Sequence, residues 1–300
     1  MNEPLVSVII PSYNPGLLIE NAIRSIERQT YKNIEIIIID DGSTDGTIEW
    51  LKKNNKRFTF ITQKNSGAAA ARNKGVSIAS GNFIAFLDAD DIWFPNKLKK
   101  QIRILQENKE ISFVFSNGII INGNIGFDTL KLESDCRDKL FDLYTNPPEL
   151  VDFNWNFRIH SVPTSSIVLK KDAFTKVGGF PHLVQGEDFA LIQLLLAYNN
   201  GYAIEEPLMC YRRHKNNTSS SIKSSSIKKR MSKVFNKDLA RITLFKILKE
   251  NNHPIPSIIK IYRFSPFICR LIILFIWRLH YGSNKNKVKK DIIKYITGRG

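Results

Sequence analysis

Short apolar runs alternate with segments of helical periodicity between residues 5 and 121, and this alternation limits the possible folds more than any other feature. Strands are predicted at 5–10, 34–39, 58–62, 83–87 and 112–121, and helices at 15–29, 47–53, 67–79 and 95–108. The run 34–39 is almost entirely isoleucine, as expected for a strand covered on both faces. The alternation predicts an α/β, Rossmann-like, mostly parallel sheet with helices on both faces.

The pattern weakens after residue 121. Residues 122–160 predict loops and short helices beside the site, and acceptor selectivity is expected to reside in residues 122–165. They are followed by a strand at 165–169, helices at 172–177 and 188–198, and an extended segment at 207–213.

Clustered aspartates follow two of the predicted strands. Asp40 and Asp41 come after the second strand, and Asp88 and Asp90 after the fourth. The carboxyl ends of parallel strands meet at one edge of a sheet, where ligands bind in such folds. Two carboxylates one residue apart can share a hard divalent cation, which takes its other ligands from substrate phosphates and water. A polar turn with a capping aspartate is the alternative reading.

Several segments together resemble the family 2 inverting glycosyltransferases with a GT-A fold, of the bacterial surface-polysaccharide type. The matching segments are 6–14, 29–45, 65–75, 88–91 and 186–188, in the family's order and spacing over residues 4–214. The resemblance implies transfer of a sugar from a nucleotide-sugar donor, a UDP-sugar, onto an acceptor hydroxyl, assisted by Mn²⁺ or Mg²⁺.

The resemblance also implies roles for individual residues. Tyr13 should pack on the nucleoside base, Asp40 should accept a hydrogen bond from the base edge, and Arg72 should approach the base or the phosphates. Alternatively, Tyr13 is a core residue and Arg72 a surface helix charge. The full set implied to bind the donor is Pro11, Tyr13, Asn14, Asp40, Asp41, Arg72 and Asp88.

The metal ligands implied by the resemblance are Asp90, Asp88 and His214. His214 ends the segment 211–214, in which Arg212 and Arg213 could neutralise phosphate charge. A histidine at a strand end can equally be a solvated or capping residue, so this role stays open.

Glu187 and Asp188 are the candidate catalytic pair. Inverting displacement needs one base to take the acceptor proton. The resemblance implies that Asp188 takes that role and that Glu187 binds or orients the acceptor. Both could instead be first-turn acids that interact with the helix dipole.

Positive charge is concentrated in the last part of the chain. The formal net charge is +16, and residues 215–300 hold 20 of the 44 Lys and Arg but 3 of the 28 Asp and Glu. We expect a glycosyltransferase domain at 1–218 and a basic, partly amphipathic helical region at 219–300. Within the latter, residues 258–281 suit an anionic membrane surface. The alternative is a helical hairpin docked on the domain. No recognisable motif supports nucleic-acid binding.

The remaining patterns bear on location and on competing functions. Cys136, Cys210 and Cys269 match no disulfide or zinc spacing, and no signal segment or bilayer span is predicted. We therefore expect a cytoplasmic protein, peripheral on the inner face of the cell membrane, with a saccharide or lipid-linked saccharide acceptor. No GxSxG, HExxH or GxGxxG motif points elsewhere. The alternative function is a non-catalytic nucleotide-binding protein with the same fold.

Overall fold

The computed structural model describes residues 3–123, 150–151, 162–181 and 186–214. The strands of this part are β1 (Val6–Ser12), β2 (Ile34–Asp40), β3 (Thr59–Thr62), β4 (Phe83–Phe86), β5 (Ile92–Trp93), β6 (Ile111–Asn122), β7 (Leu150–Val151), β8 (Val168–Lys170) and β9 (Asn200–Arg213). The helices are α1 (Leu18–Glu27), α2 (Thr47–Lys53), α3 (Ala68–Ile78), α4 (Lys97–Glu107), the 3-10 turn η3 (Thr164–Ser166), α6 (Lys171–Lys176) and α7 (Glu187–Leu196).

All the described strands belong to one sheet in the order β3-β2-β1-β4-β8-β6-β9-β5, with β7 paired to β9. Strands β3, β2, β1 and β4 are parallel, as are β6 and β9. Strand β8 runs antiparallel between β4 and β6, and β5 and β7 pair antiparallel with β9. The predicted α/β class and mostly parallel central sheet are confirmed, with antiparallel additions that the sequence pattern did not show.

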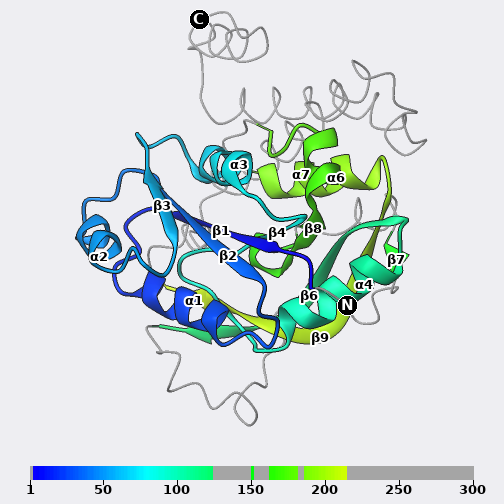
Figure 1. Ribbon diagram of the computed structural model, residues 1–300, viewed down its shortest axis with the longest axis horizontal. Coiled ribbons are helices and arrows are strands. Elements are labelled where there is room, and N and C mark those ends of the chain that lie inside the picture. The colour runs from blue at the N-terminus through cyan, green and yellow to red at the C-terminus, as the bar shows by residue number, and fades with distance from the viewer. Residues whose placement is uncertain (1–2, 124–149, 152–161, 182–185, 215–300) are drawn as a thin grey trace, which may run out of the picture. The chain divides into compact units, whose positions relative to one another are not determined.

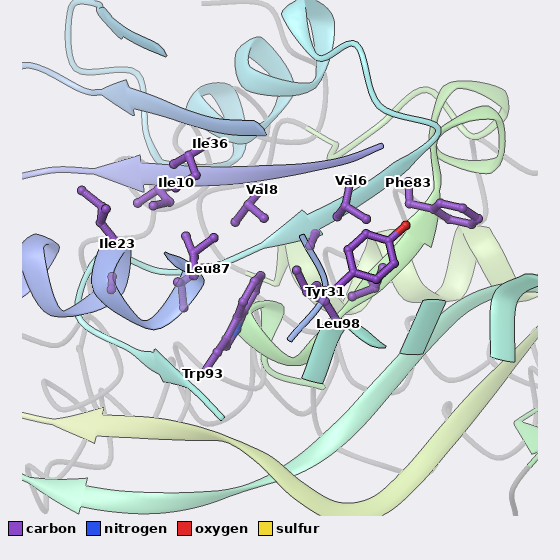
Figure 2. Close-up of a cluster of buried hydrophobic side chains, with 14 of the residues drawn as sticks. Val6, Val8, Ile10, Ile23, Tyr31, Ile36, Phe83, Leu87, Trp93 and Leu98 are labelled. Carbon is purple, nitrogen blue, oxygen red and sulfur yellow. The ribbon is translucent and has the colours of Figure 1, made fainter. Parts of the chain in front are cut away.

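Helices cover both faces of this sheet, with α1 and α4 on one face and α3, α6 and α7 on the other (Figure 1). Alternate residues of β1 face the first layer, where Val6, Val8 and Ile10 join a buried cluster with Ile23 of α1 and Trp93 (Figure 2). The intervening residues of β1 face α3. Burial on both faces explains why β1 and β2 are apolar over nearly their whole length.

Helix α3 packs unusually close to the sheet because Gly75 has no side chain. A Cβ atom at this position would lie 2.3 Å from Cγ2 of Ile9 and 3.4 Å from Cγ1 of Ile39. Since Ile9 is fully buried, it has no free space into which to move. Gly75 thereby fixes the height of α3 above the sheet, and with it the position of Arg72 one turn earlier.

The basic C-terminal part lies outside the described residues. The chain divides into two compact units, Met1–His253 and Pro254–Gly300. The predicted boundary at 218/219, the membrane-binding segment 258–281 and most of the acceptor-selective segment 122–165 fall on residues that the structure does not describe, so they stay predictions. Within the described part, no helix is both long enough and apolar enough to span a bilayer.

The Gly75→Ala substitution tests the close approach of α3. Alanine gains about 1 kcal/mol of helix propensity over glycine, but overpacking a core costs about 1–3 kcal/mol. Because the added Cβ would lie 2.3 Å from Ile9, the cost belongs at the upper end of that range. We expect the free energy of unfolding, measured by urea titration, to fall by about 1–2 kcal/mol. Lys74→Ala, at an exposed position of the same helix, is the control and should leave it nearly unchanged. A Gly75→Ala protein as stable as the parent would show that α3 does not need this contact.

Candidate functional site

The aspartates predicted to converge lie at one edge of the sheet. In the parallel register, Ser12 at the end of β1 pairs with Asp40 at the end of β2. On the other side of β1, Ile9 pairs with Phe86, and Asp88 follows two residues later. The carboxyl ends of these three strands therefore bring Asp40, Asp41 and Asp88 to the same edge, as the sequence pattern predicted.

Asp40 forms the turn that leaves β2. Its Oδ2 atom accepts the N–H groups of Gly42 at 3.2 Å and Ser43 at 3.0 Å, and Gly42 has a left-handed φ of 82°. The Oδ1 atom is buried and has no hydrogen-bond partner. A direct contact between Asp40 and a nucleoside base requires this buried oxygen to become exposed, so that role stays a prediction.

Asp41 ties the β3–α3 loop to the end of β2. Its Oδ1 accepts the side-chain amide of Gln63 and the backbone N–H of Ser66, both at 2.8 Å, and its Oδ2 accepts the N–H of Gly67 at 2.8 Å. Because Gly67 immediately precedes α3, this carboxylate holds the start of that helix at the edge of the sheet. Asp41 therefore does more than form a turn, because its carboxylate binds three groups of the β3–α3 loop.

The β1–α1 loop carries the residues predicted to meet the nucleoside. Asn14 has a left-handed φ of 51°; its Oδ1 accepts the N–H of Thr44 at 2.7 Å, and its own N–H donates to Ser43 at 2.9 Å. The side chain of Tyr13 is 56% exposed, which excludes the alternative that it is a core residue. Pro11 is partly buried within β1. The loop holds an aromatic ring in solvent, available to stack on a flat ligand.

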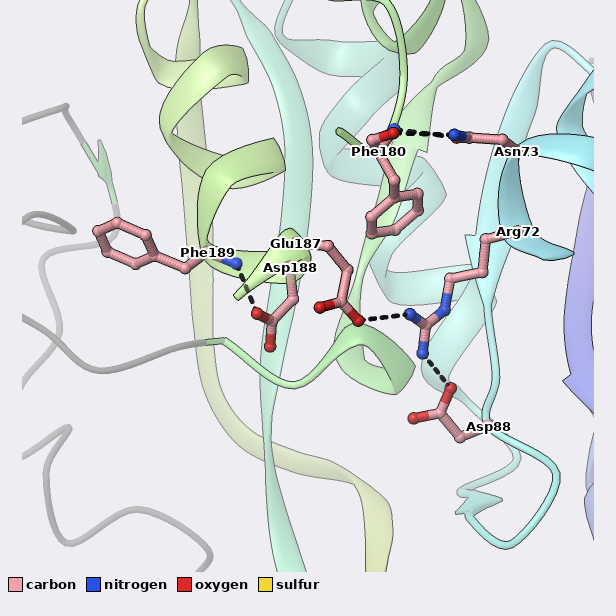
Figure 3. A network of polar contacts seen from close by, with 7 residues as sticks. All are labelled: Arg72, Asn73, Asp88, Phe180, Glu187, Asp188 and Phe189. Atoms are coloured by element: carbon pink, nitrogen blue, oxygen red, sulfur yellow. Dashed lines mark hydrogen bonds and ion pairs between the residues drawn. The ribbon is translucent and has the colours of Figure 1, made fainter. Parts of the chain in front are cut away.

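Arg72 joins the two acidic parts of the site. Its Nη2 donates to Asp88 Oδ1 at 2.6 Å, its Nη1 to Glu187 Oε1 at 3.4 Å, and its guanidinium lies 5.3 Å from the ring centre of Phe180 (Figure 3). Only 4% of Arg72 is exposed, so it is not the surface charge of the alternative reading. Burial by itself lowers the pKa of Arg72, but the charges of Asp88 and Glu187 outweigh it and raise the pKa above its ordinary value.

Phe180 and Asn73 support this arginine. The side-chain amide of Asn73 donates to the carbonyl of Phe180 at 2.8 Å and accepts its N–H at 2.9 Å (Figure 3). The ring of Phe180 also packs against Phe86 and Phe174. Two neighbouring residues of α3 therefore hold the segment that leads toward α7.

The turn after β4 carries the candidate metal ligands. Asp90 Oδ2 lies 2.8 Å from Nε2 of His214, and burial together with the charge of Asp88 raises the pKa of Asp90. The side chains of Asp88, Asp90 and His214 are 33%, 25% and 20% exposed, so each reaches solvent. The two carboxylates supply hard oxygen donors, which fit Mg²⁺ or Mn²⁺. Within the described part of the chain, no three His, Cys, Asp or Glu side chains are grouped to hold a metal by themselves. The donor set therefore fits a cation whose remaining ligands come from substrate and water.

Glu187 and Asp188 begin α7, immediately after Gly186 with its left-handed φ of 84°. Asp188 Oδ1 accepts the N–H of Phe189 at 2.7 Å, as a first-turn acid does. Burial, with a smaller effect of the Glu187 charge, raises the pKa of Asp188 to about 6. In Figure 3, Glu187 reaches toward Arg72 with Asp188 beside it, while Phe189 points away. Asp188 is thus a helix-terminal acid whose pKa is raised to about 6.

Three buried residues that were not predicted to be metal ligands lie in or against the turn at residues 88–91. Asp91, Ser165 and Arg212 are fully buried around residues 88–91, and Arg212 donates from Nε to the carbonyl of Asp90 at 2.8 Å. Arg212 was expected to be available to phosphate, but it is buried against the motif instead. Asp91 could have been found from the sequence, because it ends the acidic run 88–91. Nothing in the local sequence indicates that Ser165 contacts this turn.

Comparisons with known proteins agree with this geometry. The sequence model of glycosyl transferase family 2 matches residues 7–178. WfgD of Escherichia coli, named a UDP-Glc:alpha-D-GlcNAc-diphosphoundecaprenol beta-1,3-glucosyltransferase, is 46% identical over 126 residues, which are 41% of this chain and 49% of the relative. The match thus spans about half the length of that relative. TuaG of Bacillus subtilis, a putative teichuronic acid biosynthesis glycosyltransferase, is 32% identical over 223 residues, or 73% of this chain and 82% of the relative.

Solved structures share the fold at low sequence identity. Residues 1–349 of S. aureus TarS in complex with UDP-GlcNAc align with a TM-score of 0.58 and 19% identity, covering 79% of this chain and 66% of that one. The mannosyltransferase PcManGT of Pyrobaculum calidifontis, in complex with GDP-Man and Mn²⁺, aligns with a TM-score of 0.52 and 16% identity, covering 94% and 89%. These alignments confirm the expected GT-A architecture. With the family model covering more than half of its length, the chain belongs to glycosyl transferase family 2.

Proposed function

We propose that the protein is an inverting glycosyltransferase that moves a sugar from a UDP-sugar onto a hydroxyl of a saccharide or lipid-linked saccharide. The observation that carries this proposal is the Arg72 bridge, which connects Asp88 of the metal motif to Glu187 of the catalytic pair. The printed names of WfgD and WfaP, which specify UDP-Glc and a diphosphoundecaprenol acceptor, support the donor and acceptor classes. The UDP-GlcNAc complex of TarS supports the same donor class.

On the donor side, Tyr13 stacks on the base, and Asp88, Asp90 and His214 are the residues that would hold a divalent cation beside the diphosphate. When bound, Mn²⁺ or Mg²⁺ neutralises the diphosphate and stabilises the charge that develops on the leaving nucleotide. Arg72 remains charged and, by binding Oδ1 of Asp88, fixes the orientation of that carboxylate.

On the acceptor side, Asp188 accepts the proton of the acceptor hydroxyl as its oxygen attacks the anomeric carbon. The bond between that carbon and the diphosphate oxygen breaks, and the nucleoside diphosphate leaves with the bonding electrons, so the anomeric configuration inverts. A pKa of about 6 leaves Asp188 ionised at pH 7 and close to the optimum for a general base. Glu187, held by Arg72, orients the acceptor.

The same proposal extends to location and to the competing function. We place the protein in the cytoplasm, peripheral on the inner face of the cell membrane, where residues 258–281 contact anionic lipid. A non-catalytic nucleotide-binding protein would not need Asp88, Asp90, Glu187 and Asp188 together, and this retained set favours an enzyme.

The Asp188→Asn substitution tests the base. Asparagine keeps the size and the contact to the Phe189 amide but cannot take a proton. We expect the kcat for transfer, measured with UDP-sugars and saccharide acceptors, to fall by about 10²- to 10⁴-fold, with UDP affinity by calorimetry unchanged. Glu187→Gln, which keeps a polar neighbour, should lose less. Equal rates for Asp188→Asn and the parent on every donor and acceptor would remove the base assignment.

The raised pKa of Asp188 sets the pH dependence of the reaction. The base must be deprotonated, and below its pKa of about 6 the free enzyme holds it protonated. We expect kcat/KM to fall about tenfold per pH unit below pH 6 and to level off above it. The kcat/KM of the residual activity of Asp188→Asn should not show this fall below pH 6. A profile that is flat from pH 5 to 8 contradicts the assignment.

Deletion of residues 255–300 tests the membrane surface. If the basic segment binds anionic headgroups, the shortened protein should remain in the supernatant after sedimentation with phosphatidylserine-containing liposomes, while the full chain pellets. Neutral phosphatidylcholine liposomes are the control and should retain neither protein. Equal pelleting of both proteins with anionic liposomes overturns the membrane proposal.

A further inference from the structure

Residues 88–91, which carry the candidate metal ligands, form a hydrogen-bonded turn with one buried side. The N–H of Asp91 donates to the carbonyl of Asp88 at 3.0 Å, so the chain reverses between these residues. Asp88 and Asp90 reach solvent, but the side chain of Asp91 is buried on the inner side of the turn. Asp91 therefore cannot be a ligand in this arrangement, and its carboxylate must be satisfied from within the protein.

Ser165 contacts both ends of this turn through a single hydroxyl group. Its Oγ donates to Asp91 Oδ2 at 2.6 Å and accepts the backbone N–H of Asp88 at 3.0 Å. Ser165 itself is fully buried. One oxygen atom thus sets the distance between the first and the last residue of the turn, and so the direction in which the Asp88 side chain leaves it.

The position of Ser165 is fixed in turn by the core. Its carbonyl accepts the indole N–H of Trp93 at 2.8 Å, and the carbonyl of the neighbouring Ser166 accepts the side-chain amide of Gln101 at 2.8 Å. Trp93 and Gln101 are both fully buried. The short 3-10 turn that carries Ser165 is therefore attached to β5 and α4, and the hydroxyl has little freedom to move.

Strand β9 holds the opposite side of the turn. The backbone N–H of Arg212 donates to Asp91 Oδ1 at 3.0 Å, while its Nε donates to the carbonyl of Asp90 at 2.8 Å. Two residues later, His214 meets the carboxylate of Asp90. Asp91 is the residue at which the contacts from η3 and from β9 come together.

We infer that Ser165 and Asp91 are positioning residues that orient the carboxylates of Asp88 and Asp90 for the cation and the diphosphate. The inference rests on the proposed function, in which these two carboxylates bind that group. Partners that orient metal ligands without touching the metal commonly change metal affinity by about 10- to 100-fold when they are lost. A buried hydroxyl joined to two ends of one turn has the geometry of such a partner.

The test is a direct measurement of Mn²⁺ binding to the full chain in the presence of UDP, by the electron paramagnetic resonance signal of free Mn²⁺. We expect Ser165→Ala to raise the apparent Kd for Mn²⁺ about 10- to 100-fold, while UDP affinity without metal changes less than about twofold. Ser165→Thr restores the hydroxyl and should recover most of the affinity. Ser166→Ala is the matched control, because within the described residues the Ser166 hydroxyl bonds only the carbonyl of Pro163, at 2.7 Å.

The possible outcomes distinguish a failure of this inference from a failure of the proposed function. Parental Mn²⁺ affinity in a folded Ser165→Ala protein overturns the inference and leaves the proposed function intact. If Ser165→Ala does not fold, Asp91→Asn takes its place, since it keeps the volume and an acceptor for Arg212; parental affinity there has the same meaning. A parent chain that binds no Mn²⁺ with UDP overturns the metal site of the proposed function, and the inference with it.

Discussion

The buried guanidinium of Arg72 is the constraint on which the site depends. A charge with so little exposure is costly unless it is paired and hydrogen-bonded. Its partners, Asp88 and Glu187, come from the end of β4 and the start of α7, so satisfying one charge brings two distant segments together. Removing one partner of a buried pair costs about 3–5 kcal/mol. The side chain of Asp88 is 33% exposed, so solvent screens its interaction with Arg72. The cost of removing Asp88 therefore belongs at the lower end of that range.

Much of the fold follows from the period of the apolar residues. The predicted helix at 47–53 coincides with α2, and the strand at 34–39 differs from β2 by one residue. The predicted strand at 165–169 is instead a 3-10 turn followed by the short β8. The strand β9 begins at Asn200, whereas the prediction began at residue 207. Two glutamates and a proline at 205–207 interrupt the apolar pattern of this strand, so its first half was not predicted. The pairing with β6 shifts register near Pro207, so an irregular strand gives an irregular pattern.

The site was predictable where it rests on strand ends, and less so where it rests on tertiary contacts. Consecutive aspartates after apolar runs place Asp41 and Asp88 at one edge, and the parallel pairing of β1 with β2 and β4 brings them together. No local pattern shows that Asp40 lies inside its turn or that Ser165 reaches the turn after β4. Ser165 lies 77 residues beyond Asp88, and the burial of Asp40 depends on the packing around its turn. A single sequence carries no direct sign of either.

The central claim is that the bound cation and the bound donor engage acidic groups at the end of β4 and at the start of α7 at the same time. Anomalous diffraction at the manganese edge, from crystals grown with Mn²⁺ and a nonhydrolysable UDP-sugar, measures this directly. The account predicts a manganese peak in contact with Asp90 and the diphosphate, with the anomeric carbon facing Asp188 and Arg72 still joined to Glu187. A peak elsewhere, with Asp90 turned away from the diphosphate, would contradict it.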